Sequence, residues 1–159
     1  MLKTIIINLL IWFLIGAFLL NLIVFLVYTT GMVHTAREKD GTLKKKMSLK
    51  GLLAMLGMLL LILLFIQGFD YTTFRNVDPL RFSDILIANT ILILLLVFYD
   101  SFFIDLFVLG KWRPGFLNIP EELTLESMKQ HVKKQFTLGW LIVVPLILLS
   151  ALINYLLLG

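Results

Sequence analysis

Four apolar stretches, each long enough to cross a lipid bilayer, constrain this chain more than any other feature. They cover residues 4–33, 49–67, 84–109 and 138–158. A helix needs about 20 predominantly apolar residues to cross the hydrocarbon core. The chain is 60% hydrophobic, which is more apolar surface than a soluble domain of this length can bury. We therefore predict a single transmembrane domain: an all-α, integral membrane four-helix bundle.

The charges between these stretches predict how the bundle is oriented. Residues 34–50 hold six of the chain's 14 Lys and Arg residues, and residues 110–135 hold five more. Short loops rich in Lys and Arg stay in the cytoplasm. We expect both loops inside, residues 68–83 as an outer loop, and both the N and C termini outside. The expected location is the cell membrane, in a multi-pass arrangement.

The same cations predict the partners of the protein. The net charge is +4, but it is concentrated in loops that flank apolar spans, so it indicates attraction to anionic lipid headgroups and no nucleic acid. A homo-oligomer or a second membrane protein stays open as a further partner. The predicted headgroup-binding residues are Lys44, Lys45, Lys46, Lys50, Lys111, Arg113, Lys133 and Lys134.

A helix between the third and fourth stretches is expected to lie in the inner membrane interface, over about residues 120–136. Pro120 suits a first helical position. An apolar stripe recurs at helical spacing, as is typical of an amphipathic interfacial helix. Its members are Leu125, Met128, Val132 and Phe136.

Polar side chains inside the apolar stretches mark the predicted helix contacts. Counting about 1.5 Å per residue sorts them into two tiers by depth. Amides are common hydrogen-bonding groups between membrane helices, so the outer tier is expected to lock helix register. The inner tier carries a carboxylate, which is costly in hydrocarbon and therefore a hint of function. The outer tier is Asn8, Gln67, Asn89 and Asn154, and the inner tier is Asn21, Tyr28 and Asp100.

Two acidic residues of the third stretch are the candidates for chemistry. On an α-helix Asp100 and Asp105 would lie about 140° apart and would not share a face. Asp105 is expected to pair with Lys111 or Arg113. In the alternative interpretation, Asp100, Asp105 and His131 form a catalytic set.

No metal and no cofactor is expected, because no spacing resembles HExxH or another ligand motif. If a metal were bound, its candidate ligands would be His34, Asp105 and His131. The chain has no cysteine, which excludes disulfides and thiolate sites.

Residues 99–140 resemble small four-span bacterial membrane proteins of unassigned function. The resemblance rests on Tyr99-Asp100, Asp105, Arg113-Pro114, Ile119-Pro120-Glu121-Glu122, His131 and Gly139-Trp140. In those proteins a glycine is expected where this chain has Glu121. The resemblance implies that Asp100, Asp105, Pro120 and His131 belong to one functional surface, and it supplies no reaction.

Three functions follow from these observations, and enzymatic activity is left open. The first is a non-enzymatic scaffold, regulatory or lipid-binding subunit. The second is a proton- or cation-coupled transport or channel component that uses Asp100. The third is a membrane-embedded, lipid-active enzyme that uses Asp100, Asp105 and His131.

Overall fold

The computed structural model describes residues 2–30 and 49–158, and within them the chain is all-α. The third crossing is formed by two segments, α4 and η1, that follow each other without a break. Four helices are long and apolar enough to cross a membrane, so the predicted four-span class is confirmed and the chain is a multi-pass membrane protein. The elements are α1 (Leu2–Thr29), α3 (Leu49–Phe74), α4 (Phe82–Phe98), η1 (Tyr99–Trp112), α5 (Leu125–Leu138) and α6 (Trp140–Leu158).

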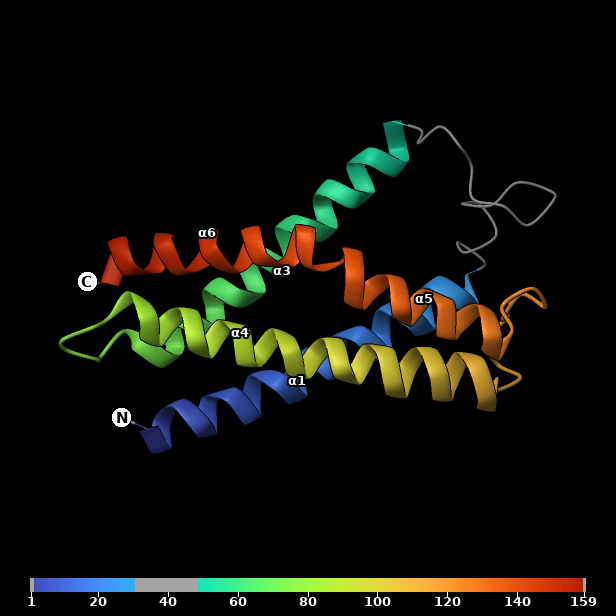
Figure 1. Ribbon diagram of the computed structural model, residues 1–159, viewed down its shortest axis with the longest axis horizontal. Helices are drawn as coiled ribbons and strands as arrows, with labels where there is room; N and C mark the ends of the chain where they lie inside the picture. Colours follow the sequence, from blue (N-terminus) through green and yellow to red (C-terminus); the bar gives the residue numbers. More distant parts are fainter. Residues whose placement is uncertain (1, 31–48, 159) are drawn as a thin grey trace.

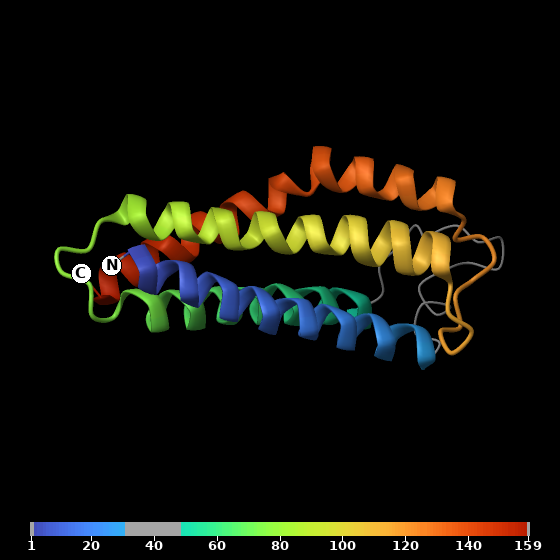
Figure 2. The same cartoon turned by 90° about the horizontal axis from the view of Figure 1, so that it is seen from below.

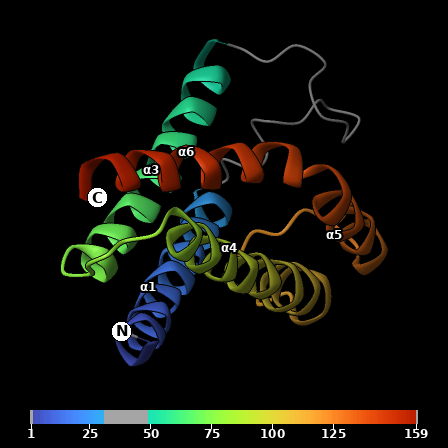
Figure 3. The same cartoon turned by 60° about the vertical axis from the view of Figure 1, so that its left-hand side comes forward.

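The helices run lengthwise, and both chain termini lie at the same end of the molecule (Figure 1). The turn between α3 and α4 lies at that end too, which we call the terminal end. Residues 113–124 form the connection at the opposite end, which we call the loop end (Figure 2). α4 packs against α1 and α6, α3 packs against α1 and α6, and α5 packs against η1. Figure 3 shows α3 crossing beneath α6 while its first turns point away from the other helices.

The second span is longer than predicted, because α3 continues through Gln67 to Phe74. The expected outer loop over residues 68–83 is therefore wrong in its first half. Phe69 and Phe74 are fully buried, and this burial outweighs the low helix propensity of Gly68. Gly68 is itself required, since a Cβ there would lie 2.6 Å from the indole ring of Trp12.

An apolar layer crosses the middle of the bundle. Ile66, Ile93 and Ile147 come from α3, α4 and α6 and pack together with at most 7% of their surface exposed. We call these three residues the isoleucine layer. Each isoleucine lies about one helical turn from a polar residue nearer the terminal end: Asp70, Asn89 or Ser150. The layer therefore lies between these polar residues and the loop end.

The second part of the third crossing is a π-helix, in which each N–H group bonds to the carbonyl five residues back. The bond from the Arg113 N–H to the Val108 carbonyl is 2.8 Å long. Aromatic rings stack four residues apart along its exposed side, with 5.1 Å between the ring centres of Tyr99 and Phe103 and 5.8 Å between those of Phe103 and Phe107. η1 ends at Trp112, and the next residue, Arg113, has a left-handed φ of 49°.

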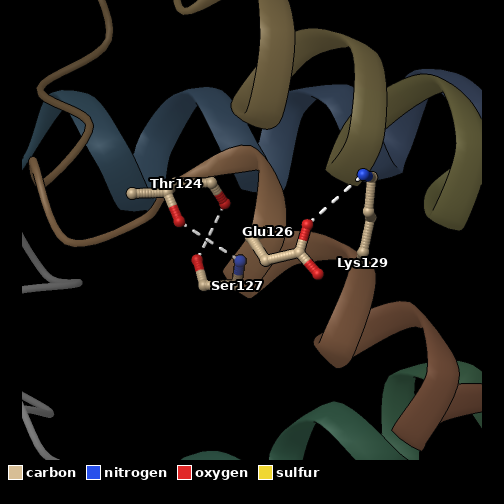
Figure 4. A network of polar contacts seen from close by, with 4 residues as sticks. All are labelled: Thr124, Glu126, Ser127 and Lys129. Atoms are coloured by element: carbon tan, nitrogen blue, oxygen red, sulfur yellow. Dashed lines mark hydrogen bonds and ion pairs between the residues drawn. The ribbon is translucent and has the colours of Figure 1, made fainter.

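The helix expected over residues 120–136 exists, but it begins at Leu125. Before it, the Arg113 guanidinium donates to the carbonyls of Leu123 and Pro120, which holds this segment as a loop. Thr124 then caps α5: its hydroxyl accepts a hydrogen bond of 3.2 Å from the N–H of Ser127 (Figure 4). The same view shows the ion pair of 3.3 Å between Lys129 and Glu126 one turn further on.

Candidate functional site

Two polar clusters lie inside this fold, and the first joins η1 to α5. The side-chain amide of Gln135 donates to Asp100 Oδ2 at 3.0 Å, and Gln135 Oε1 accepts from the hydroxyl of Ser101 at 2.9 Å. One turn earlier on α5, His131 Nε2 lies 3.7 Å from Asp105 Oδ2. We call these five residues the η1–α5 site. It lies toward the loop end, where α5 runs alongside η1 (Figures 1 and 2).

The two carboxylates share a face, contrary to the expectation from α-helical geometry. In a π-helix the N–H of one residue bonds to the carbonyl five residues back, so residues five apart are neighbours across one turn. Asp100 and Asp105 are five apart in η1, and both point toward α5, where Gln135 and His131 are one turn apart. The wrong prediction came from the assumption of an α-helix and not from the choice of residues.

The expected pairing of Asp105 with Lys111 or Arg113 is also wrong. Asp105 is buried and its ion-pair partner is His131, whose side chain is 60% exposed. The guanidinium of Arg113 is bonded to loop carbonyls, and Lys111 is exposed. The site therefore joins a buried carboxylate to a surface imidazole.

This arrangement can exchange a proton with water through His131, or orient an imidazole for acid–base work. Within residues 2–30 and 49–158, no group of three His, Cys, Asp or Glu residues could hold a metal ion. His34 lies outside these ranges, so its predicted role is not addressed. Pro120 lies in the loop before α5, where its carbonyl accepts from Arg113.

The second polar cluster lies between the isoleucine layer and the terminal end. Its centre is Asp70, fully buried on α3. Asp70 Oδ2 accepts hydrogen bonds from Asn89 Nδ2 at 3.0 Å, Ser150 Oγ at 3.0 Å and Asn154 Nδ2 at 2.8 Å. Gln67 adds a bond of 3.1 Å to Ser150. We call these five residues the Asp70 cluster; it ties α3 to α4 and α6.

Sequence reasoning missed Asp70, which was assigned to a loop. A signal was present, because Asp70 follows Gln67 by three residues and so shares its helix face. The outer tier did contain the amides that surround it: Gln67, Asn89 and Asn154 all belong to the cluster. The fourth member of that tier, Asn8, lies apart and donates to the Thr72 carbonyl at 3.3 Å.

The inner tier does not assemble around a single group. Asn21 Nδ2 lies 2.5 Å from the hydroxyl of Tyr99, whereas Asp100 bonds to Gln135. Tyr28 is buried at the loop end in an apolar cluster that includes Ile104.

The predicted headgroup-binding residues are placed as follows. Lys111 is exposed near the end of η1, and Lys133 and Lys134 are exposed in the second half of α5. Arg113 has its guanidinium bonded within the loop. Lys50 belongs to α3, but its side chain lies outside the described part of the structure, as do Lys44, Lys45 and Lys46 altogether.

Comparison with known proteins identifies no relative: no family model, curated protein or solved structure matches the chain. The local resemblance of residues 99–140 therefore stays without support from a family, and function has to be argued from the two polar clusters.

Proposed function

We propose that this chain is a non-catalytic membrane subunit that binds anionic lipid headgroups on the inner side of the membrane through η1 and α5. The observation that carries the proposal is the side-by-side packing of the amphipathic helix α5 on the second half of the third crossing. This packing puts exposed lysines and exposed aromatic rings on neighbouring helices.

The length of the third crossing supports an interfacial position for this unit. The helix from Phe82 to Trp112 has 31 residues, whereas about 20 cross the hydrocarbon core. α6, which begins only at Trp140, has 19 residues and is long enough to span the core by itself. The extra length of the third crossing is η1, the part against which α5 packs. Headgroup level is where such a helix pair satisfies both its polar and its apolar faces.

The side chains exposed on η1 and α5 are of the types that bind at the membrane interface. Phe102, Phe103, Phe107 and Trp112 of η1 are between 42% and 58% exposed. Lys133 and Lys134 are exposed on α5. Aromatic rings favour the headgroup layer, and each lysine near an anionic surface contributes about 1 kcal/mol of attraction.

Lipid retention tests the proposal. The purified protein is exchanged into mixed phosphatidylglycerol and phosphatidylcholine, and the bound lipid is measured by native mass spectrometry. We expect a preference for phosphatidylglycerol that falls about thirtyfold in the double variant Lys133→Gln, Lys134→Gln, from two contributions of about 1 kcal/mol. The matched control is Arg75→Gln, Arg81→Gln at the terminal end, which should keep the preference. Equal retention of both lipids by the wild type would refute the proposal.

Transport through Asp100 is less well supported, because the isoleucine layer lies between the η1–α5 site and the Asp70 cluster. Two surface hollows on the described residues lie at the two ends of the molecule, and neither is lined by Asp100. In liposomes we expect proton and cation flux at the level of empty vesicles, unchanged by Asp100→Asn. Flux above that level that is lost in Asp100→Asn would reinstate transport.

The contact between His131 and Asp105 favours a second candidate, acid–base chemistry on a lipid headgroup. A carboxylate that orients an imidazole is a common catalytic pairing. Incubation of the protein with phospholipid vesicles, followed by product analysis, tests it. New products that disappear in His131→Gln would support an enzyme; an unchanged lipid profile favours the binding function.

A further inference from the structure

Three buried oxygen atoms in and beside the Asp70 cluster have no hydrogen-bond partner among the described residues: Asp70 Oδ1, Asn89 Oδ1 and Thr73 Oγ1. Asp70 and Asn89 have no exposed surface, and Thr73 is 4% exposed. Buried polar atoms are almost always paired, so three unpaired oxygens in one place need a physical reason.

These oxygens belong to side chains that are neighbours in the fold. Thr73 follows Asp70 by three residues, so both side chains lie on the same face of α3. The amide of Asn89 already donates to Asp70 Oδ2 at 3.0 Å, so its own oxygen belongs to a group in direct contact with the carboxylate. The three oxygens therefore come from α3 and α4 where these helices meet.

The carboxylate of Asp70 has no positive partner in the described structure. Its three hydrogen-bond donors are neutral, and none of the Lys, Arg and His side chains that the structure describes lies within 4.0 Å of it. The guanidinium of Arg75, the residue after α3, lies instead 5.7 Å from the centre of the Tyr71 ring. An isolated carboxylate in an apolar interior is strongly disfavoured, so the site takes up a positive charge from outside the chain, either a proton or a cation.

A cation satisfies this site better than a proton does. A proton on Asp70 Oδ1 pairs with one further oxygen at most, whereas a metal ion contacts several oxygens at once. Carboxylate, carbonyl and hydroxyl oxygens are the ligands of hard cations, and one carboxylate balances a single positive charge. We propose that Asp70, Thr73 and Asn89 form a binding site for a monovalent alkali cation, with Na⁺ the first ion to test.

The surroundings indicate a site that holds an ion without conducting it. The isoleucine layer closes the cluster on the side of the loop end. On the other side, a groove at the terminal end is lined by residues 75–80 together with Tyr155, Leu156 and Leu158. Leu158 lies one helical turn beyond Asn154, so this groove is on the terminal-end side of the cluster. The site is independent of the headgroup-binding function proposed for η1 and α5.

Thermal unfolding of the full chain in lipid nanodiscs tests the proposal. Unfolding is followed by tryptophan fluorescence, since the ring of Trp12 packs on Phe65 and Phe69 beside the site. NaCl, LiCl and KCl are compared with choline chloride at equal ionic strength. A ligand that binds only the folded state raises Tm, here by about 5 °C or more at saturation. We expect this rise with at least one alkali chloride and none with choline chloride.

Two variants locate the ion. Asp70→Asn keeps the shape of the side chain and removes its charge, so Tm should become the same in all four salts. Thr73→Val removes one ligand and should raise the salt concentration at half-maximal effect about tenfold. The matched control is Thr90→Val, because the Thr90 hydroxyl donates to the Leu86 carbonyl at 2.7 Å and not to the cluster. This control should respond to salt like the wild type.

Direct binding keeps the proposal testable if Asp70→Asn fails to fold. Equilibrium dialysis with radioactive sodium should find a single ion per wild-type chain and weaker binding to Thr73→Val. Equal Tm in choline and in every alkali salt, with stability responding to pH alone, would show that Asp70 carries a proton and would overturn the cation site. Salt dependence that persists in Asp70→Asn, or no sodium bound in dialysis, would overturn it as well.

Discussion

At the scale of single residues, the same side-chain type has different roles at different positions. Asp70 is fully enclosed and receives three hydrogen bonds on one oxygen, whereas Asp100 is half-buried and receives one from Gln135. Amides supply most of these donors, because an amide can bond to a carboxylate without bringing a charge into the apolar interior. The polar residues within the crossings therefore join helices first, and any ligand chemistry is built on those contacts.

Asn154→Leu tests the contribution of one such donor. The variant keeps a similar volume but removes the bond of 2.8 Å to Asp70, so a buried carboxylate loses a partner. We expect a loss of about 1–3 kcal/mol in the free energy of unfolding, measured by denaturant titration in micelles at fixed salt. Asn76→Ala, on an exposed residue, should stay within about 0.5 kcal/mol of wild type. Equal stability of the two variants would contradict the assigned role.

Gly68→Ala and Gly57→Ala form a second pair at this scale. A Cβ on Gly68 would lie 2.6 Å from the Trp12 ring, while a Cβ on Gly57 would meet nothing within 4 Å. Overpacking costs about 1–3 kcal/mol, and removing an exposed helical glycine gains about 0.5–1 kcal/mol. Thermal unfolding should therefore show a lower Tm for Gly68→Ala and an equal or higher Tm for Gly57→Ala. The opposite order would mean that α1 and α3 do not approach as described.

At the scale of elements, the pair formed by η1 and α5 is the distinctive part of the fold. π-helical geometry turns Asp100 and Asp105 to the same side, and α5 presents one partner to each. π-helical segments often mark functional positions. Here the polar contacts position an amphipathic helix whose exposed side remains available to headgroups.

Gln135→Leu tests how α5 is held. The variant leaves both Asp100 and Ser101 without the partner that they share. We expect the amides of residues 125–138 to exchange with solvent about tenfold faster, because a buried hydrogen-bonding pair is worth roughly 1.4 kcal/mol. Hydrogen exchange with mass spectrometry measures this. Gln130→Leu, on an exposed position of the same helix, serves as control; if it accelerates exchange equally, the Gln135 contacts do not hold α5.

At the scale of the whole molecule, both termini and the turn between α3 and α4 lie at one end, and the loop of residues 113–124 lies at the other (Figure 1). Lys and Arg residues concentrate in residues 34–50 and 110–135. The positive-inside rule predicts that the loop end faces the cytoplasm. This orientation is the premise of headgroup binding on the inner side.

Single cysteines test the orientation, since the chain has none of its own. Asn76→Cys at the terminal end and Gly115→Cys at the loop end are both on exposed residues. We expect a membrane-impermeant maleimide to label Asn76→Cys in intact cells, and to label Gly115→Cys only after the membrane is opened. The reversed pattern would place the basic loops outside.

The sequence by itself determined the class of the fold and three of the amides that meet near the terminal end. Four long apolar stretches allow one solution, because a membrane-embedded backbone has to satisfy its hydrogen bonds within each helix. The depths of Gln67, Asn89 and Asn154 could be counted from helical rise, and these three residues do meet. The ends of the spans and of α5 were predicted less well. Burial of Phe69 and Phe74 extends α3 beyond its predicted end. The hydrogen bonds of Arg113 to loop carbonyls hold the residues before Leu125 as a loop, so α5 begins later than predicted.

Only the tertiary structure decided which carboxylate lies at the centre of the bundle. Asp70 looked like a loop residue, because a glycine precedes it by two positions and its donors come from α4 and α6, 19, 80 and 84 residues away. The shared face of Asp100 and Asp105 was equally hidden, since a π-helix cannot be told from an α-helix by apolar periodicity in a stretch that is apolar all round. The local sequence pattern determines which segments are helical and how deep each polar residue lies in the membrane. The hydrogen-bond partners of a polar residue are determined by packing between segments that are distant in the sequence.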